Sequence, residues 1–293
     1  MTVSEIVHRF LAHKAATVTP GTLTGYRRGL FWLLASFEDV AWEDLVRADV
    51  KDALQESFLG HHGQELKAAT KNRNRGAFKM LQNYVVDELE AGEEVLKKHD
   101  LKNQKTDRRE VFVDWDDFRT LAKHLRRDAL PICEFLMLTA ARPGEACNAR
   151  IEDIEERVGL RVVVLEEHKT AKKTGKPRRI TLNGEASEVV ERAIGGRREG
   201  PIFRTKRCEP WTPSNLSSVW RAARSQAGLD PRLVLYTTRH GAVTRALKAG
   251  VPIAFVAQMA GHEDMKTTQG YAHLGDEEAA KAAAMAAVGF KAA

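Results

Sequence analysis

The chain has 293 residues, of which 43% are hydrophobic and 29% are charged, and its formal net charge is +6. These values exclude wholesale disorder, predict about two domains and favour a polyanionic partner. The three scattered cysteines exclude a disulfide framework, and no apolar run approaches the ~18 residues of a membrane span. We therefore expect a soluble, cytoplasmic protein without membrane contact.

Residues 1–95 have the pattern of helices joined by short connections. Thr19 and Pro20 offer a capping hydroxyl and a first-turn proline, and the stretch after them carries an apolar stripe that includes Tyr26 and Leu30. A later helix is predicted over about 66–86, with Phe78 directed to the core. The segment therefore predicts a small helical bundle.

The helix predicted over 66–86 carries only positive charges. Such a run is usually a solvated helix face, but here it is interleaved with asparagine on a short bundle, as a surface that follows phosphates requires. The basic residues assigned to nucleic-acid binding in this bundle are Arg27, Arg28, Lys71, Arg73, Arg75 and Lys79.

Residues 96–110 are polar and mostly basic, and they predict an interdomain linker. Beyond them, residues 111–275 form a second region that is mostly helical. It contains two apolar stretches rich in β-branched residues that predict a hairpin joined by a long basic loop. The predicted helices are 111–125, 129–140, 214–228, 237–250 and 252–261, and the predicted strands are 161–167 and 178–182.

Several side chains in the second region stand where an anion could reach them. Arg142 directly follows a buried helix, while Arg239 and His240 lie at a helix start, where free N–H groups and the positive dipole end favour an anion. Lys169 opens the hairpin loop, and His262 follows a glycine that ends a helix. Taken singly, each of these residues more often has a structural role.

In combination, these residues suit attack on a phosphodiester. Two arginines can each place a guanidinium fork on phosphate oxygens, and a lysine can protonate the leaving oxygen. In GHEDMKTTQGYAHL, at 261–274, Tyr271 offers a phenol that a positive pocket would activate as a nucleophile, although a lone tyrosine is more often packing. No carboxylate cluster suggests Mg²⁺, so we expect neither a metal nor another cofactor.

The second region resembles the catalytic domain of the tyrosine recombinases, also called phage integrases. The family has an arginine with an acidic residue three positions later, a lysine on a β-hairpin, a histidine three residues before a second arginine, a Gly-His pair and then the tyrosine. The corresponding residues here are Arg142 with Glu145, Lys169, Tyr236 with Arg239, His262 and Tyr271. The similarity runs from about 110 to 275.

The resemblance implies a mainly α protein of two domains. Residues 1–95 would be a helical, SAM-like bundle that binds the core DNA site, and residues 111–275 would be a mixed, mostly helical catalytic domain with a small antiparallel β-sheet. The alanine-rich tail, 276–293, would form a helix that docks on a neighbouring protomer, the alternative being a frayed helix on its own subunit or in solvent.

The resemblance also implies the chemistry. Tyr271 would attack a DNA phosphate, forming a 3'-phosphotyrosyl bond and freeing a 5'-hydroxyl, while Lys169 protonates the departing oxygen. Arg142, Arg239 and His262 would hold the non-bridging oxygens. Glu145 would orient its neighbours without touching the phosphate. Religation would need neither metal nor ATP.

Two positions in the site leave questions open. Tyr236 stands where the family has a histidine, and a tyrosine can donate a hydrogen bond but cannot carry an imidazolium charge. The general acid is assigned to Lys169, although the same loop also contains Lys172, Lys173 and Lys176.

The implied partner is double-stranded DNA at a recombination site. The family works as a homo-tetramer on two DNA sites and exchanges strands through a Holliday junction, and we expect a monomer in solution. The alternatives are a helix-turn-helix regulator, read from ALKAGVPIAFVAQMAGH, a catalytically inactive DNA-binding relative, or the same cleavage chemistry used as in type IB topoisomerases.

Overall fold

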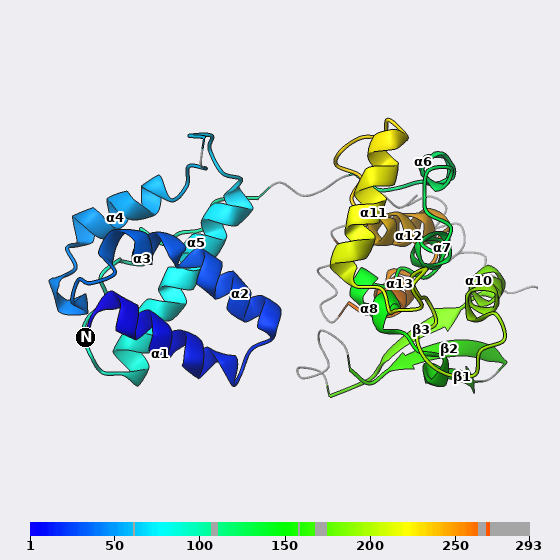
Figure 1. Cartoon of the computed structure of the whole chain (residues 1–293), viewed down its shortest axis with the longest axis horizontal. Helices are drawn as coiled ribbons and strands as arrows, with labels where there is room; N and C mark the ends of the chain where they lie inside the picture. Colours follow the sequence, from blue (N-terminus) through cyan, green and yellow to red (C-terminus); the bar gives the residue numbers. More distant parts are fainter. Residues whose placement is uncertain (61, 107–110, 158, 168–174, 263–267, 270–293) are drawn as a thin grey trace, which may run out of the picture. The chain divides into compact units, whose positions relative to one another are not determined.

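The structure is a computed structural model of the whole chain, and it describes all residues except 61, 107–110, 158, 168–174, 263–267 and 270–293. The chain divides into two compact units, Met1–Arg109 and Glu110–Ala293. Figure 1 labels the helices and strands of both units, and each unit is described here by itself.

The first unit is a helical bundle. Its longest helix, α5, contacts α2 closely, because Gly29 offers no side chain where a Cβ would lie 2.6 Å from the Cβ of Ala77. Thr19 caps α2 by accepting a hydrogen bond from the backbone N–H of Thr22, as the sequence predicts. The core includes Phe10 and Phe78, both fully buried. The elements are α1 (Val3–Ala15), α2 (Pro20–Gly29), α3 (Phe31–Phe37), a 3-10 helix (Trp42–Asp44), α4 (Arg47–Glu56), α5 (Ala68–Asn83) and a π-helical turn (Tyr84–Glu88).

Part of the predicted linker packs on this bundle. Leu96 is fully buried, and its backbone N–H and C=O both bond the side-chain amide of Gln82, at 2.8 and 3.0 Å. The Asn72 side chain bonds the backbone of Gln104 in the same reciprocal way. The linker predicted for 96–110 therefore begins too early, because its first residues satisfy their backbone groups on the first unit.

The second unit combines helices with one small sheet, as predicted. Strands β1, β2 and β3 form an antiparallel sheet in that order, with Val163 of β2 paired with Ile154 of β1 and with Ile180 of β3. The sequence analysis missed β1, which is only four residues long and has three charged residues among them. The elements are α6 (Trp115–Ala122), α7 (Leu130–Thr139), α8 (Pro143–Asn148), a 3-10 helix (Ile151–Asp153), β1 (Ile154–Arg157), β2 (Leu160–Leu165), β3 (Arg178–Leu182), α10 (Gly184–Ile194), α11 (Pro213–Gln226), α12 (Thr237–Lys248) and α13 (Ile253–Ala260).

Helix α7 is the buried centre of this unit and contacts both α10 and α12 (Figure 1). Helix α12 also packs closely against the start of the unit. Gly241 permits this approach because it has no Cβ, which would lie 2.3 Å from the backbone oxygen of Val113. The Arg245 guanidinium donates to that same oxygen and to the backbone oxygen of Met137. These contacts fix the helix that carries Arg239. None of the helices described has the length and apolar character needed to cross a membrane.

Candidate active site

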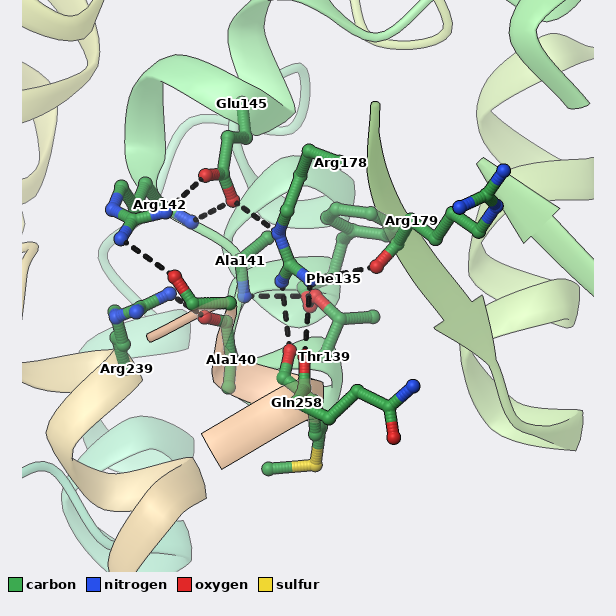
Figure 2. Close-up of polar contacts among 12 residues, drawn as sticks. Phe135, Thr139, Ala140, Ala141, Arg142, Glu145, Arg178, Arg179, Arg239 and Gln258 are labelled. Carbon is green, nitrogen blue, oxygen red and sulfur yellow. Dashed lines mark hydrogen bonds and ion pairs between the residues drawn. The ribbon is translucent and has the colours of Figure 1, made fainter. Parts of the chain in front are cut away.

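Arg142 lies at the turn between α7 and α8. Helix α7 ends in Ala140, whose φ of 55° is left-handed, and this bend turns the chain so that Arg142 becomes the N-cap of α8. The Arg142 backbone N–H and guanidinium both donate to Glu145, at 2.9 and 2.6 Å, and another guanidinium N–H donates to the backbone oxygen of Gly261 at 3.0 Å (Figure 2). The guanidinium is therefore held between two segments 119 residues apart.

Glu145 is a buried carboxylate between two arginines. Its Oε2 accepts from Nε of Arg178 at 3.3 Å, and its side chain is only 3% exposed. Burial raises the pKa of Glu145, but the Arg178 charge, together with the hydrogen bonds and charge of Arg142, more than offsets it, so the net pKa lies below the usual 4.5. Glu145 therefore remains ionised and orients both guanidinium groups.

Arg239 is a nearly fully buried cation in the first turn of α12. One guanidinium nitrogen, Nη1, donates to the backbone oxygen of Ala140 at 2.8 Å, whereas Nη2 is buried and has no partner among the residues that the structure describes. Burial first, and then the Arg142 charge, lower the pKa of Arg239 to about 10, which leaves it charged at neutral pH. A buried charged donor without an acceptor is costly, and an anionic ligand would supply the acceptor.

His262 follows Gly261, the left-handed residue that ends α13. The imidazole Nδ1 lies 2.8 Å from the hydroxyl of Thr268, which orients the ring. Burial, followed by the charges of Arg239 and Arg142, lowers the pKa of His262 to about 4. The ring is therefore neutral at pH 7 and lies in a strongly positive environment.

Tyr236 is the N-cap of α12 and is 39% exposed. Its ring lies 5.2 Å from that of His240 in an edge-on arrangement. Tyr236 and Arg142 both line a cavity of about 510 Å³ that is also lined by Trp220 of α11. Tyr236 and Arg142 therefore border the same cavity.

The structure thus brings Arg142, Glu145, Arg239 and His262 into one cluster, with Tyr236 in the adjoining cavity. Lys169 and Tyr271, the predicted general acid and nucleophile, lie outside the described residues, as does the tail 276–293. Within the described part of the chain, no three His, Cys, Asp or Glu side chains are grouped as metal ligands would be.

Sequence analysis missed Arg178, which joins this cluster from β3. Alternate residues of β3 face inward, so Arg178 shares the buried face of Ile180 and Leu182. The signal in the sequence that could have identified Arg178 is its place at the start of β3, on the apolar face of the strand.

The basic helix of the first unit differs from the prediction in one respect. Arg27, Arg28, Arg73 and Lys79 are exposed, but Lys71 and Arg75 are only 5% and 6% exposed. The Lys71 ammonium pairs with Glu65, and the Arg75 guanidinium lies 4.3 Å from the centre of the Phe58 ring. Lys71 and Arg75 therefore lie inside the bundle and not on its exposed basic surface, because residues 71, 75 and 78 fall on the core-facing side of the helix.

Comparison with known proteins agrees with this architecture. The model of the phage integrase family matches residues 112–278, which is more than half of the chain. The chain is 23% identical over 288 residues to tyrosine recombinase XerD of Corynebacterium glutamicum, covering 90% of this chain and 92% of the relative. It is 28% identical over 278 residues to tyrosine recombinase XerC of Pseudomonas putida, covering 88% and 86%. With XerC of Halalkalibacterium halodurans it is 25% identical over 153 residues, only 48% of either chain.

Solved structures share the fold. The Tn1549 transposon integrase in complex with transposon right end DNA has a TM-score of 0.72 at 15% identity, with 99% of this chain and 100% of that chain covered. A lambda integrase tetramer bound to a Holliday junction has a TM-score of 0.70 at 16% identity, with 90% and 78% covered.

Fold and relatives together define a site-specific recombinase of the tyrosine type. The chain belongs to the phage integrase family. The helix-turn-helix regulator is not favoured: Val256, Ala257 and Ala260 of α13 are buried, and its exposed side carries Phe255 and Gln258, which offers few polar groups to read base edges.

Proposed function

We propose that this enzyme binds duplex DNA at a recombination site and cleaves and rejoins it through a 3'-phosphotyrosyl intermediate. The observation that carries the proposal is the convergence of Arg142, Arg239 and His262, together with the buried Nη2 of Arg239, which has no acceptor among the described residues. A phosphate is the anion whose oxygens can satisfy two guanidinium groups and an imidazole together.

In this mechanism, Arg142 and Arg239 neutralise the non-bridging oxygens of the scissile phosphate. His262 is oriented through Nδ1 and donates from Nε2, and the Tyr236 hydroxyl adds a hydrogen bond from the adjoining cavity. Because Glu145 is anionic and already engaged by two arginines, it orients them and does not contact the phosphate.

The covalent step is assigned to Tyr271 and Lys169 from their place in the family's order. The Tyr271 phenol releases its proton to water, and its oxygen forms a bond to phosphorus while the bond from phosphorus to the 5'-oxygen breaks. Lys169 gives its proton to that 5'-oxygen, a transfer worth about 10²- to 10⁴-fold in rate. Religation reverses the step when a partner strand's 5'-hydroxyl attacks the phosphotyrosine.

The rest of the chain has corresponding roles in the proposal. Residues 1–95 bind the core site, and their exposed cations Arg27, Arg28, Arg73 and Lys79 contact phosphates. Residues 111–275 are the catalytic domain, and 276–293 docks on a neighbouring protomer. Four protomers act on two DNA sites, as the lambda integrase tetramer on a Holliday junction suggests.

Covalent trapping on nicked duplexes, drawn from DNA flanking the gene, tests the proposal. The wild-type chain should form a detergent-resistant adduct in the presence of a chelator, whereas Tyr271→Phe should bind the same DNA without forming one. If the wild type binds DNA but forms no adduct, the chain is an inactive relative. Tyr236→His is then the first variant to examine, because it restores the family's imidazole.

A further inference from the structure

Arg178 is the most fully engaged arginine of the cluster. It is 5% exposed, and four of its five N–H groups donate to protein acceptors: Glu145 Oε2 at 3.3 Å and the backbone oxygens of Arg179, Gln258 and Met259 at 2.6, 3.4 and 2.7 Å (Figure 2). Arg239 differs, because its Nη2 has no acceptor within the described residues. Arg239 therefore keeps a donor for a ligand, whereas the donors of Arg178 hold the protein together.

Two of the acceptors of Arg178 are carbonyls in the last turn of α13. The Gln258 carbonyl also accepts from the backbone N–H of Gly261 at 3.0 Å. Arg178 adds a cationic donor to both carbonyls, at the negative end of the helix dipole. The guanidinium also lies against Gly261, where an added Cβ would be only 2.9 Å from Nε of Arg178. The turn that presents His262 is thus built directly on Arg178.

The contacts close into a ring. Arg142 donates to Glu145, Glu145 accepts from Arg178, Arg178 holds the end of α13, and Gly261 just beyond that end accepts from Arg142. The ring ties α8, β3 and α13 together. Because each element is hydrogen-bonded to the next, we expect a shift of one of these three elements to displace the other two.

We propose that Arg178 is a positioning residue that sets the distance between Arg142 and His262, so that both reach the same phosphate. This inference rests on the proposed function. Arginine is required because its planar fork serves acceptors in several directions at once, whereas a lysine ammonium offers three donors from a single point and cannot reach all of them.

The test compares Arg178→Lys with Arg179→Met. Arg179 is the neighbouring arginine, and its side chain is exposed and points away from the cluster (Figure 2), so its variant removes a cation from the same strand without touching the ring. Arg178→Lys should slow adduct formation on a nicked duplex by about 100-fold, as expected for a displacement of about 1 Å, with DNA affinity unchanged. Arg179→Met should leave the cleavage rate unchanged.

A second readout does not depend on cleavage. The imidazole signals of His262, assigned in NMR spectra with a His262→Gln variant, should shift in folded Arg178→Lys and stay in place in Arg179→Met. A wild type that forms no adduct would count against the proposed function, while the His262 signals would still decide the role of Arg178.

Gly261→Ala disturbs the same contact while Arg178 remains intact. This variant guards against loss of folding in Arg178→Lys, and it should also slow adduct formation and shift the His262 signals. Two results would overturn the inference. One is that Arg178→Lys forms the adduct at the wild-type rate with unchanged His262 signals. The other is that its slower adduct formation is matched by an equal loss of DNA affinity, which would mean that Arg178 contacts DNA itself.

Discussion

Replacing Glu145 by glutamine should destabilise the second unit strongly. The carboxylate is 3% exposed and pairs with both Arg142 and Arg178. Glutamine keeps the shape and one acceptor oxygen but leaves both guanidinium groups without their counter-charge, next to Arg239. Removal of one partner from a buried ion pair costs about 3–5 kcal/mol. Because glutamine retains an acceptor, we expect ~3 kcal/mol, or about 6–12 °C in melting temperature for a unit of this size.

Urea and thermal unfolding of the whole chain would measure this loss. The matched control is Glu191→Gln, which removes a carboxylate that is 57% exposed and paired with Arg161 at the surface. That variant should cost less than about 1 kcal/mol. The double variant Glu145→Gln/Arg178→Met should lose less unfolding free energy than the two single variants lose together, because the two residues are in direct contact. If Glu145→Gln costs no more than the control, or if the double variant is additive, the buried charge network does not hold the site together.

Three further predictions follow from packing, titration and exposure. Gly241→Ala should destabilise the second unit by about 1–3 kcal/mol, although alanine has the better helix propensity, because the new Cβ would lie 2.3 Å from the backbone oxygen of Val113. Gly25→Ala, at a helical glycine with open space around it, is the control and should be neutral or stabilising in the same thermal unfolding experiment. The free energy of unfolding should fall as pH decreases from 6.5 to about 4, because the depressed pKa of His262 in the folded state means that the unfolded chain binds this proton at a higher pH. Below pH 4.5 the stabilising contribution of Glu145, whose folded-state pKa is also lowered, should be lost as well. NMR titration should show that bound duplex raises the pKa of His262, and an unchanged pKa would place the phosphate elsewhere. Arg73→Gln should reduce the slope of log binding constant against log salt concentration by about one unit, because Arg73 is exposed. Arg75→Gln should leave that slope unchanged and lower the melting temperature, because Arg75 is buried. Equal effects of the two variants on the slope would contradict the burial of Arg75.

Sequence patterns predicted the local features well. The cap of α2 by Thr19 needs only a hydroxyl placed before a helix start, and strands β2 and β3 follow from short apolar stretches rich in β-branched residues. The pairing of Arg142 with Glu145, which the sequence analysis did not predict, also spans only three residues in sequence. The cap and the strands each form within one element or between neighbours in sequence, so local patterns are enough to predict them.

Other features depended on which side of a helix or strand faces the core. The run of cations on α5 is continuous in sequence, but the helix turns Lys71 and Arg75 into the bundle and leaves Arg73 and Lys79 outside. Residues 96–106 resemble a linker in composition, yet Gln82 and Asn72 bind their backbone. Composition does not reveal such partners.

The sequence by itself determined the family, the order of the predicted catalytic residues and the helical and strand segments that carry most of them, since these depend on residue type and spacing. Only the tertiary structure decided that Arg142 reaches Gly261 across 119 residues and that Arg239 reaches Ala140 across 99. It also decided that Arg178 binds both Glu145 and the end of α13. Contacts between distant segments form when whole elements pack together, and their geometry depends on the buried surfaces of the entire unit rather than on any local pattern.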